Sequence, residues 1–195
     1  MYKSLFLGFT FLFFSTIMLL GQKTFVRYSE IGGKVGWSPI NNVSFVDMNK
    51  PVVFDNSMIG FRFLHAEEKF LGVIFEVNYN KSTTTMNGIF YSYDFIQTPL
   101  MTHVFFPIKK TNVALNVGSY LQFITDQNSS DILLERNLLY GLAGGVSFCV
   151  PIKNISLTFE GRINYNLFSN SKKDYTKLGN WMEFSVVACY RKWWK

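Results

Sequence analysis

Ionisable side chains on one face of repeated strand-like segments are the residues of this chain best placed to do chemistry. Four acids and four bases share this pattern: Glu30, Lys34, Arg62, Glu76, Glu160, Arg162, Glu183 and Arg191. Most of them stand between apolar neighbours, which is typical of β-strands with one polar and one apolar face. Opposite charges in equal number on one face can neutralise one another or can line a path for protons or ions.

The two histidines are the other residues with catalytic potential. A hydrolase acting on lipid would use a histidine beside a serine or an acid on a membrane-facing surface. His65 has Glu67 as its neighbour on the apolar face, whereas His103 lies on the polar face of its segment. Neither has a serine two residues away on its own face, so we interpret both as packed or interfacial histidines and predict that the protein is not an enzyme.

Other signatures of catalysis or ligand binding are missing from the sequence. It contains no Gly-rich phosphate loop, no pair of catalytic carboxylates and no cluster with metal-ligand spacing. We therefore predict no catalytic residue, no cofactor and no metal. Cys149 and Cys189 fall in strand-like segments separated by one further segment, and we expect two free, packed thiols there.

The chain is basic, with 19 Lys and Arg against 13 Asp and Glu, a formal net charge of +6. Nucleic acid is one class of partner for such a charge, but the strand-like segments carry no basic stripe with interleaved aromatic residues. Basic turns and loops beside acidic lipid head groups are the alternative that we favour. We predict no nucleic-acid partner.

The first residues have the order of a secretory signal peptide. A short basic start (Met1 to Lys3) precedes an apolar run from Leu5 to Leu20 and a small residue, Gly21. We expect a signal peptide over residues 1–21 and one mature domain over residues 22–195. An uncleaved anchor is the alternative, because the apolar run is long for a signal peptide.

Eight segments of alternating apolar and polar residues follow the apolar run. They cover residues 27–38, 57–66, 70–80, 89–106, 112–124, 138–150, 155–167 and 181–194. Long connections at 41–56, 81–87, 125–136 and 168–180 alternate with short turns at 67–69, 107–111 and 151–154. This order predicts an all-β fold, an eight-stranded antiparallel up-and-down transmembrane β-barrel with every long loop at one end.

The direction of the apolar face separates a membrane barrel from a soluble one such as a lipocalin. The polar face is rich in Gly, Ser and Asn with isolated charges, which is typical of a narrow filled interior. Aromatic residues gather near the long-loop ends of the apolar face (Trp37, Tyr79, Tyr140, Tyr165 and Trp181) and near the short-turn ends (Phe148, Tyr190 and Trp194). Two such girdles favour a membrane barrel.

A barrel of eight strands has a lumen only wide enough for side chains to fill. The eight ionisable residues are then expected to form a mutually neutralising plug, because an unpaired charge in that space costs several kcal/mol. A proton or ion path is the alternative.

Two stretches resemble the PorT-like family of outer-membrane β-barrels from Bacteroidota. Residues 95–106, F-I-Q-T-P-L-M-T-H-V-F-F, are similar to the family's Y-L-E-I-P-L-L-L-K-Y-Y-F, with Phe95, Pro99, Leu100, Met101 and Phe106 matching in kind. Residues 184–192, F-S-V-V-A-C-Y-R-K, resemble the family's closing F-S-L-S-L-G-Y-R-F, except that a lysine replaces the last aromatic residue.

The resemblance implies a location in the bacterial outer membrane and a role linked to type IX secretion or gliding, which some family members serve. We accordingly predict a non-enzymatic scaffold or accessory component of the cell envelope. Its partners would be outer-membrane lipid and other envelope or secretion proteins. The alternative is a stand-alone small barrel that acts as an adhesin, a narrow channel or a lipid-modifying enzyme.

Overall fold

A computed structural model describes residues 26–41, 53–86, 89–108, 110–127, 138–167 and 181–194 of the chain. The predicted signal peptide, residues 1–21, lies outside these ranges. Among the residues described, no helix is long and apolar enough to cross a membrane.

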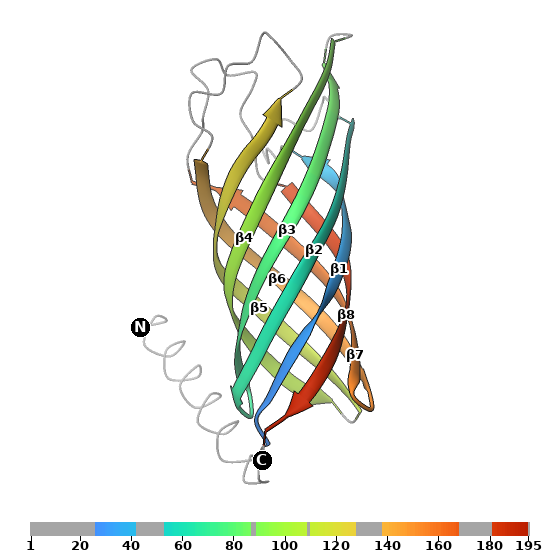
Figure 1. The fold of residues 1–195 in the computed structure, drawn as a ribbon, viewed down its shortest axis with the longest axis vertical. Coiled ribbons are helices and arrows are strands. Elements are labelled where there is room, and N and C mark those ends of the chain that lie inside the picture. Colours follow the sequence, from blue (N-terminus) through green and yellow to red (C-terminus); the bar gives the residue numbers. More distant parts are fainter. Residues whose placement is uncertain are drawn as a thin grey trace, which may run out of the picture.

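Eight strands form one closed antiparallel barrel (Figure 1). They are β1 (Tyr28–Asn41), β2 (Val53–Glu68), β3 (Leu71–Met86), β4 (Ile89–Ile108), β5 (Thr111–Gln127), β6 (Leu138–Ile152), β7 (Ile155–Asn166) and β8 (Trp181–Trp193). Each strand pairs with the next in the chain, and β1 pairs with β8 to close the ring. The predicted all-β, eight-stranded up-and-down barrel is confirmed.

One end of the barrel carries the start of β1, the end of β8 and the tight β2–β3, β4–β5 and β6–β7 turns, at the bottom of Figure 1. We call it the short-turn end. Only Lys69 and Phe70 separate β2 from β3, and only Lys153 and Asn154 separate β6 from β7. The start of β1 and the end of β8 therefore both lie at the short-turn end, as an even number of strands requires.

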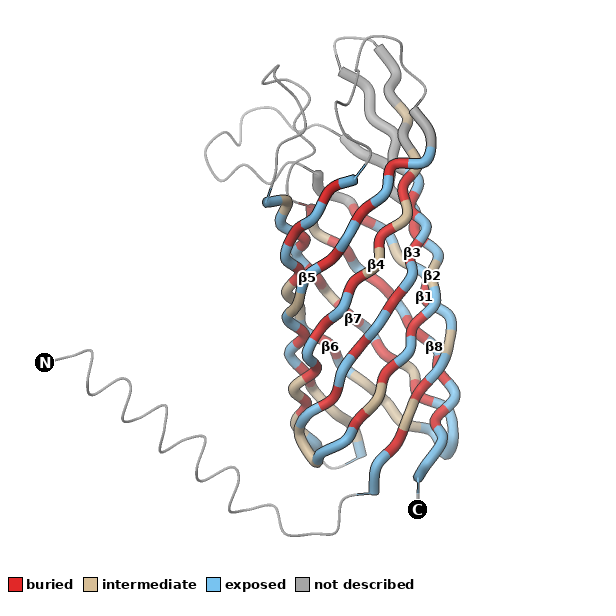
Figure 2. Tube along the Cα trace, turned by 60° about the vertical axis from the view of Figure 1, so that its left-hand side comes forward, coloured by how far each residue is buried: buried red, intermediate tan, exposed pale blue. Residues whose placement is uncertain are grey.

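Side chains alternate between a buried and an exposed position along each strand (Figure 2). The outward positions hold large apolar residues, such as Val117 (65% exposed) and Ile59 (62% exposed). Four predicted girdle residues, Trp37, Tyr79, Tyr140 and Tyr165, are exposed among them, as are Phe148, Tyr190 and Trp194 at the other end. The polar face lines the interior, so the predicted assignment of the two faces is confirmed.

Trp181 is the exception among the predicted girdle residues. Its side chain is buried in the lumen, at ring-centroid distances of 6.0 Å from Phe95 and 5.6 Å from Tyr120. The residue lies two positions before Glu183, so the alternation along β8 places it on the lumen face, and only its aromatic type had suggested a girdle position. The prediction that Trp181 faces lipid was wrong.

The predicted polar loop at 81–87 is also corrected, because β3 continues to Met86. Lys81 pairs with Asp94 and Met86 pairs with Ile89, so this stretch forms a long hairpin with β4. Its run of Ser and Thr is polar, but β-branched Thr favours strands. The strict alternation of long and short connections was therefore wrong at this position.

Other predicted loops shorten because the strands continue further than their apolar patterns. Asn41 belongs to β1, Val53 to Asn56 belong to β2, and Thr125 to Gln127 belong to β5. The remainder of those predicted loops, and the loop predicted at 168–180, lie outside the described residues. These strand ends lack the alternation of apolar and polar residues from which the strands were predicted.

Pro99 sits inside β4, with its side chain buried in the lumen. The β4–β5 ladder continues through it, with Pro99 opposite Tyr120. The β3–β4 ladder is interrupted there, between the Phe75–Leu100 and Asn78–Gln97 pairs. Proline has no N–H to donate, so β4 is held at this point from the β5 side.

Close contact between β4 and β5 predicts unequal effects of one substitution at two glycines. A Cβ on Gly118 would clash with the carbonyl oxygen of Leu100, whereas a Cβ on Gly144 would meet nothing within 4 Å. We expect Gly118→Ala to lower the free energy of unfolding by about 1 to 3 kcal/mol. Gly144→Ala should leave it unchanged or raise it by about 0.5 kcal/mol. Urea unfolding of the refolded barrel in lipid vesicles measures both, and equal effects would contradict the β4–β5 register.

Candidate functional site

The eight ionisable residues singled out in the sequence all face the lumen. Each is at most 5% exposed: Glu30, Lys34, Arg62, Glu76, Glu160, Arg162, Glu183 and Arg191. They come from β1, β2, β3, β7 and β8, so the closed barrel brings together residues far apart in the chain. The structure resolves them into a central cluster of six residues and a separate pair.

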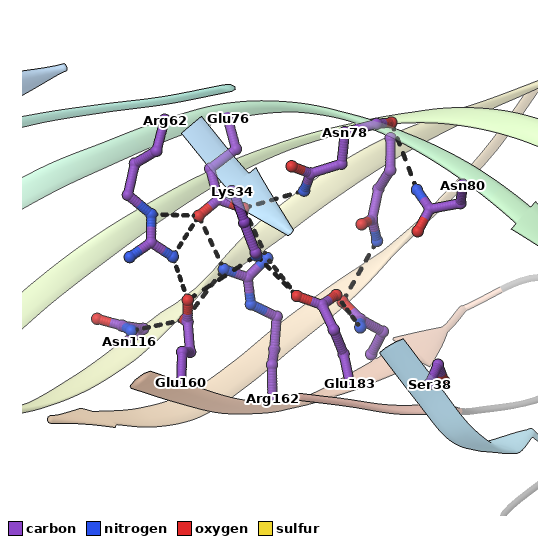
Figure 3. Close-up of polar contacts among 12 residues, drawn as sticks. Lys34, Ser38, Arg62, Glu76, Asn78, Asn80, Asn116, Glu160, Arg162 and Glu183 are labelled. Atoms are coloured by element: carbon purple, nitrogen blue, oxygen red, sulfur yellow. Dashed lines mark hydrogen bonds and ion pairs between the residues drawn. The ribbon is translucent and has the colours of Figure 1, made fainter. Parts of the chain in front are cut away.

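Glu76 on β3 is the centre of the cluster (Figure 3). Its carboxylate accepts a hydrogen bond from Arg62 Nε at 2.6 Å and from Lys34 Nζ at 3.0 Å. Arg162 binds it with both terminal nitrogens, each at 3.0 Å from a carboxylate oxygen. Such two-pronged arginine contacts are among the strong charge-assisted hydrogen bonds.

Two further acids balance the three bases. Glu160 contacts Arg62. It also accepts hydrogen bonds from Arg162 Nη2 at 3.0 Å and from the side-chain amide of Asn116 at 2.8 Å. Glu183 Oε1 lies 2.7 Å from Lys34 Nζ. Three bases and three acids give the central cluster a net formal charge of zero.

The separate pair joins the two strands that close the barrel. Arg191 Nε on β8 donates to Glu30 Oε1 on β1 at 2.6 Å. The Arg191 guanidinium also lies over the ring of Tyr28, 4.3 Å from its centroid. Between this pair and the central cluster the lumen has a cavity of ≈ 10 Å³, about enough for one water molecule.

Aromatic side chains fill the lumen beyond the central cluster, on the side away from the short-turn end. Phe95, Tyr120 and Trp181 meet there. Tyr120 also donates a hydrogen bond to the Asn166 side chain at 2.6 Å. The described lumen is therefore filled by a charge-neutral plug and an aromatic layer. The sequence analysis predicted the plug for a barrel of this size, but not the aromatic layer.

His103 and the two cysteines are packed into the same interior. His103 Nδ1 lies 2.6 Å from the Asn116 amide oxygen, and its ring stacks on Phe105 at 5.3 Å between centroids. Cys149 and Cys189 are free thiols. Within the described ranges, no group of three or more His, Cys, Asp or Glu residues is placed to hold a metal ion.

His65 has a serine neighbour that the sequence analysis missed. Ser29 on β1 pairs directly with His65 on β2, and Ser29 Oγ lies 2.9 Å from His65 Nδ1. Glu67 Oε2 lies 3.0 Å from His65 Nε2. Neither histidine has a serine two residues away on its own face, as the sequence analysis stated, but that search followed one strand only. The register of β1 against β2 reveals the serine on the neighbouring strand.

Comparison with known proteins finds likeness at the level of the fold. No protein-family model matches the chain, and no curated protein matches it. Solved eight-stranded outer-membrane barrels do share its fold, at 12–14% sequence identity.

A major outer-membrane protein from Thermus thermophilus aligns with a TM-score of 0.55 and 12% identity, over 84% of this chain and 99% of that one. The N-terminal barrel domain of OprF from Pseudomonas aeruginosa gives 0.52 and 12%, over 85% and 97%. The attachment invasion locus protein Ail from Yersinia pestis gives 0.52 and 14%, over 87% and 100%.

The exterior of the barrel agrees with this fold. A closed strand ladder satisfies its own backbone hydrogen bonds, and its exposed apolar side chains would be unfavourable in water over so large an area. The chain is a bacterial outer-membrane β-barrel.

The plug predicts strong coupling between Glu160 and Arg162. Glu160→Gln or Arg162→Met alone leaves three charges of one sign against two of the other in a dry space. Each single change should therefore lower the free energy of unfolding by about 3 to 5 kcal/mol. The double variant keeps two acids and two bases and should lose much less than the sum. Urea unfolding in vesicles measures the cycle, and small, additive losses would show instead that these side chains are hydrated.

Proposed function

We propose that this outer-membrane barrel is a scaffold or accessory component of the cell envelope, acting through its rims and loops and not through its lumen. The observation that carries the proposal is the balanced ion network across the interior. Each of the eight lumen charges contacts an opposite charge of the protein itself. A lumen occupied in this way has little capacity to bind or pass a solute.

The short-turn end supports the proposal because charged side chains are exposed at each of its three short turns. Its described exposed or half-buried charges are five bases and two acids, a net charge of +3: Arg27, Lys69, Lys110, Lys153, Lys192, Glu67 and Glu68. Lys69, Lys110 and Lys153 lie in the β2–β3, β4–β5 and β6–β7 turns, respectively. Such a rim suits the acidic surface of an envelope protein, since complementary charge steers association.

The process that we propose for the scaffold comes from the resemblance of residues 95–106 and 184–192 to the PorT-like family. Some members of that family serve the type IX secretion and gliding machinery. The partners would then be other components of that machinery in the same membrane. The stretch 95–106 lies in β4, where Pro99 and its neighbours form part of the barrel wall, so the resemblance concerns the scaffold itself and not a reactive site.

The proposal predicts that rim charges matter for partner binding and lumen charges do not. The Lys110→Glu/Lys153→Glu variant should lose most of the envelope proteins that co-purify with the native barrel in mild detergent, because it reverses one positive charge in each of two turns. The Glu30→Gln/Arg191→Met variant is the matched control with two altered lumen charges. It should keep those partners wherever unboiled gel migration shows it to be folded.

Planar-bilayer recording provides the second measurement. The native barrel should show no resolved conductance steps, since the plug and the aromatic layer fill the lumen. Resolved steps, or partner loss in the lumen variant alone, would contradict the scaffold proposal and favour a channel.

A further inference from the structure

Ser29, His65 and Glu67 form a chain of hydrogen bonds on the outer face of the barrel at the short-turn end. We call it the rim triad. An ionised carboxylate can only accept hydrogen bonds, so His65 Nε2 carries the proton that it shares with Glu67 at 3.0 Å. His65 Nδ1 then has a free lone pair, which accepts the Ser29 hydroxyl proton at 2.9 Å.

A fourth residue orients the serine. Trp194 Nε1 donates a hydrogen bond to Ser29 Oγ at 3.0 Å, which occupies one lone pair of that oxygen and leaves its own proton directed at His65. The backbone N–H of Trp194 is held in turn by the carbonyl of Arg27 at 2.8 Å. A serine hydroxyl bonded to a histidine that an acid holds is the arrangement that activates serine nucleophiles.

The rim triad is accessible from outside the barrel. The His65 side chain is 40% exposed and the Glu67 side chain 51% exposed, and Ser29 is half-buried. Lys192 lies on the neighbouring strand β8, directly opposite Ser29 in the β1–β8 ladder. Its ammonium lies 4.8 Å from the centre of the Trp194 ring. An exposed cation beside the serine suits a phosphate group at the membrane surface.

Two small residues lie on the apolar surface further from the short-turn end than Ser29, and we call them the Gly33–Ala188 strip. Gly33 and Ala188 pair across the β1–β8 seam, and both point outward. A Cβ on Gly33 would meet no atom within 4 Å. Four residues along β1 correspond to about 13 Å. An acyl chain that starts at Ser29 therefore passes over the exposed Ile31–Tyr190 pair before it reaches this strip.

We propose that the rim triad hydrolyses acyl esters of anionic glycerophospholipids in the membrane leaflet at the short-turn end. Lys192 binds the phosphate, the Gly33–Ala188 strip receives the acyl chain, and Ser29 meets the ester carbonyl between them. A phospholipid of that leaflet presents a phosphate, an ester and a chain in this order from the surface inward.

The reaction has two steps. Ser29 Oγ bonds to the carbonyl carbon while its proton passes to His65 Nδ1. The bond from that carbon to the glycerol oxygen then breaks, and the oxygen takes the proton from His65. In the second step a water molecule gives one proton to His65 and bonds to the acyl carbon. The Ser29 ester then breaks, and the serine recovers its proton, so that each cycle consumes one water and releases one lysophospholipid and one fatty acid.

Ser29 and His65 are catalytic residues in this proposal, and Glu67 is a positioning residue that holds the histidine. Glu67 and Lys192 belong to both the charged rim and the hydrolytic site, but the rim lysines at residues 110 and 153 lie on other turns than the rim triad, so the two roles can be tested with different residues.

The test uses the full mature chain reconstituted in phosphatidylglycerol vesicles, with fatty acid release followed by mass spectrometry. A fluorophosphonate probe should modify Ser29, mapped by peptide mass spectrometry, because the probe reacts with activated serines. We expect Ser29→Ala to abolish both signals and His65→Ala to lower release at least about 100-fold. Glu67→Gln should lower kcat with little change in KM, since Glu67 does not touch the substrate.

Matched controls separate catalysis from folding and from binding. Ser119→Ala removes another outward serine, paired with Leu100 and Leu142, and should leave release and labelling unchanged. Gly33→Leu should lower release of long acyl chains and spare short-chain esters, because it fills the strip at a position where an added Cβ meets no atom within 4 Å. Native migration on an unboiled gel confirms folding for each variant.

Two results would overturn the proposal: native protein that releases no fatty acid and takes no label, or release that survives Ser29→Ala. The first would leave Ser29 and His65 as a purely structural link between β1 and β2. Neither result would bear on the scaffold, because Ser29→Ala should retain all co-purifying partners whether or not the native barrel hydrolyses lipid.

Discussion

The whole interior depends on one electrostatic constraint, which is that a charge inside a closed eight-stranded barrel must find its counter-charge within the barrel. Glu76 meets this constraint by contacting Lys34, Arg62 and Arg162, from three other strands. An acid on β3 is therefore satisfied only when β1, β2 and β7 are all in place. The network ties the strands to one another across the lumen, in addition to the ladder that joins them side by side.

Period-two alternation was enough to predict the strands and which residues share a face. The aromatic girdles and the small polar residues of the other face were needed to predict which face lies inside. The alternation works because each strand has an apolar face toward lipid and a polar face toward the lumen, so Glu160 and Arg162 could be placed inside without knowing any partner. It failed where that contrast fades. The run of Ser and Thr after Lys81 was predicted to be a loop because it is polar. Trp181 was predicted to be a girdle residue because it is aromatic.

Pairing between strands could not be predicted, because it depends on register. Ser29 and His65 are separated by 36 positions in the chain, and a shift of β1 against β2 would remove their contact. The same is true of Glu30 and Arg191, which meet only because β8 returns to β1. Sequence reasoning identified the members of the plug and missed the rim triad for one reason: the plug follows from which way side chains point, whereas the rim triad follows from which residues lie opposite each other.

The Glu30–Arg191 pair at the β1–β8 seam also bears on how the protein enters its membrane. Until that seam closes, an inserting sheet would carry an acid on one free edge and a base on the other, both facing a space that lipid can enter. Partly inserted forms are thus penalised twice, by unpaired backbone groups and by unmatched charge. Insertion and closure are therefore expected to occur as one cooperative event, and the two edges, with opposite charges, attract each other as they approach.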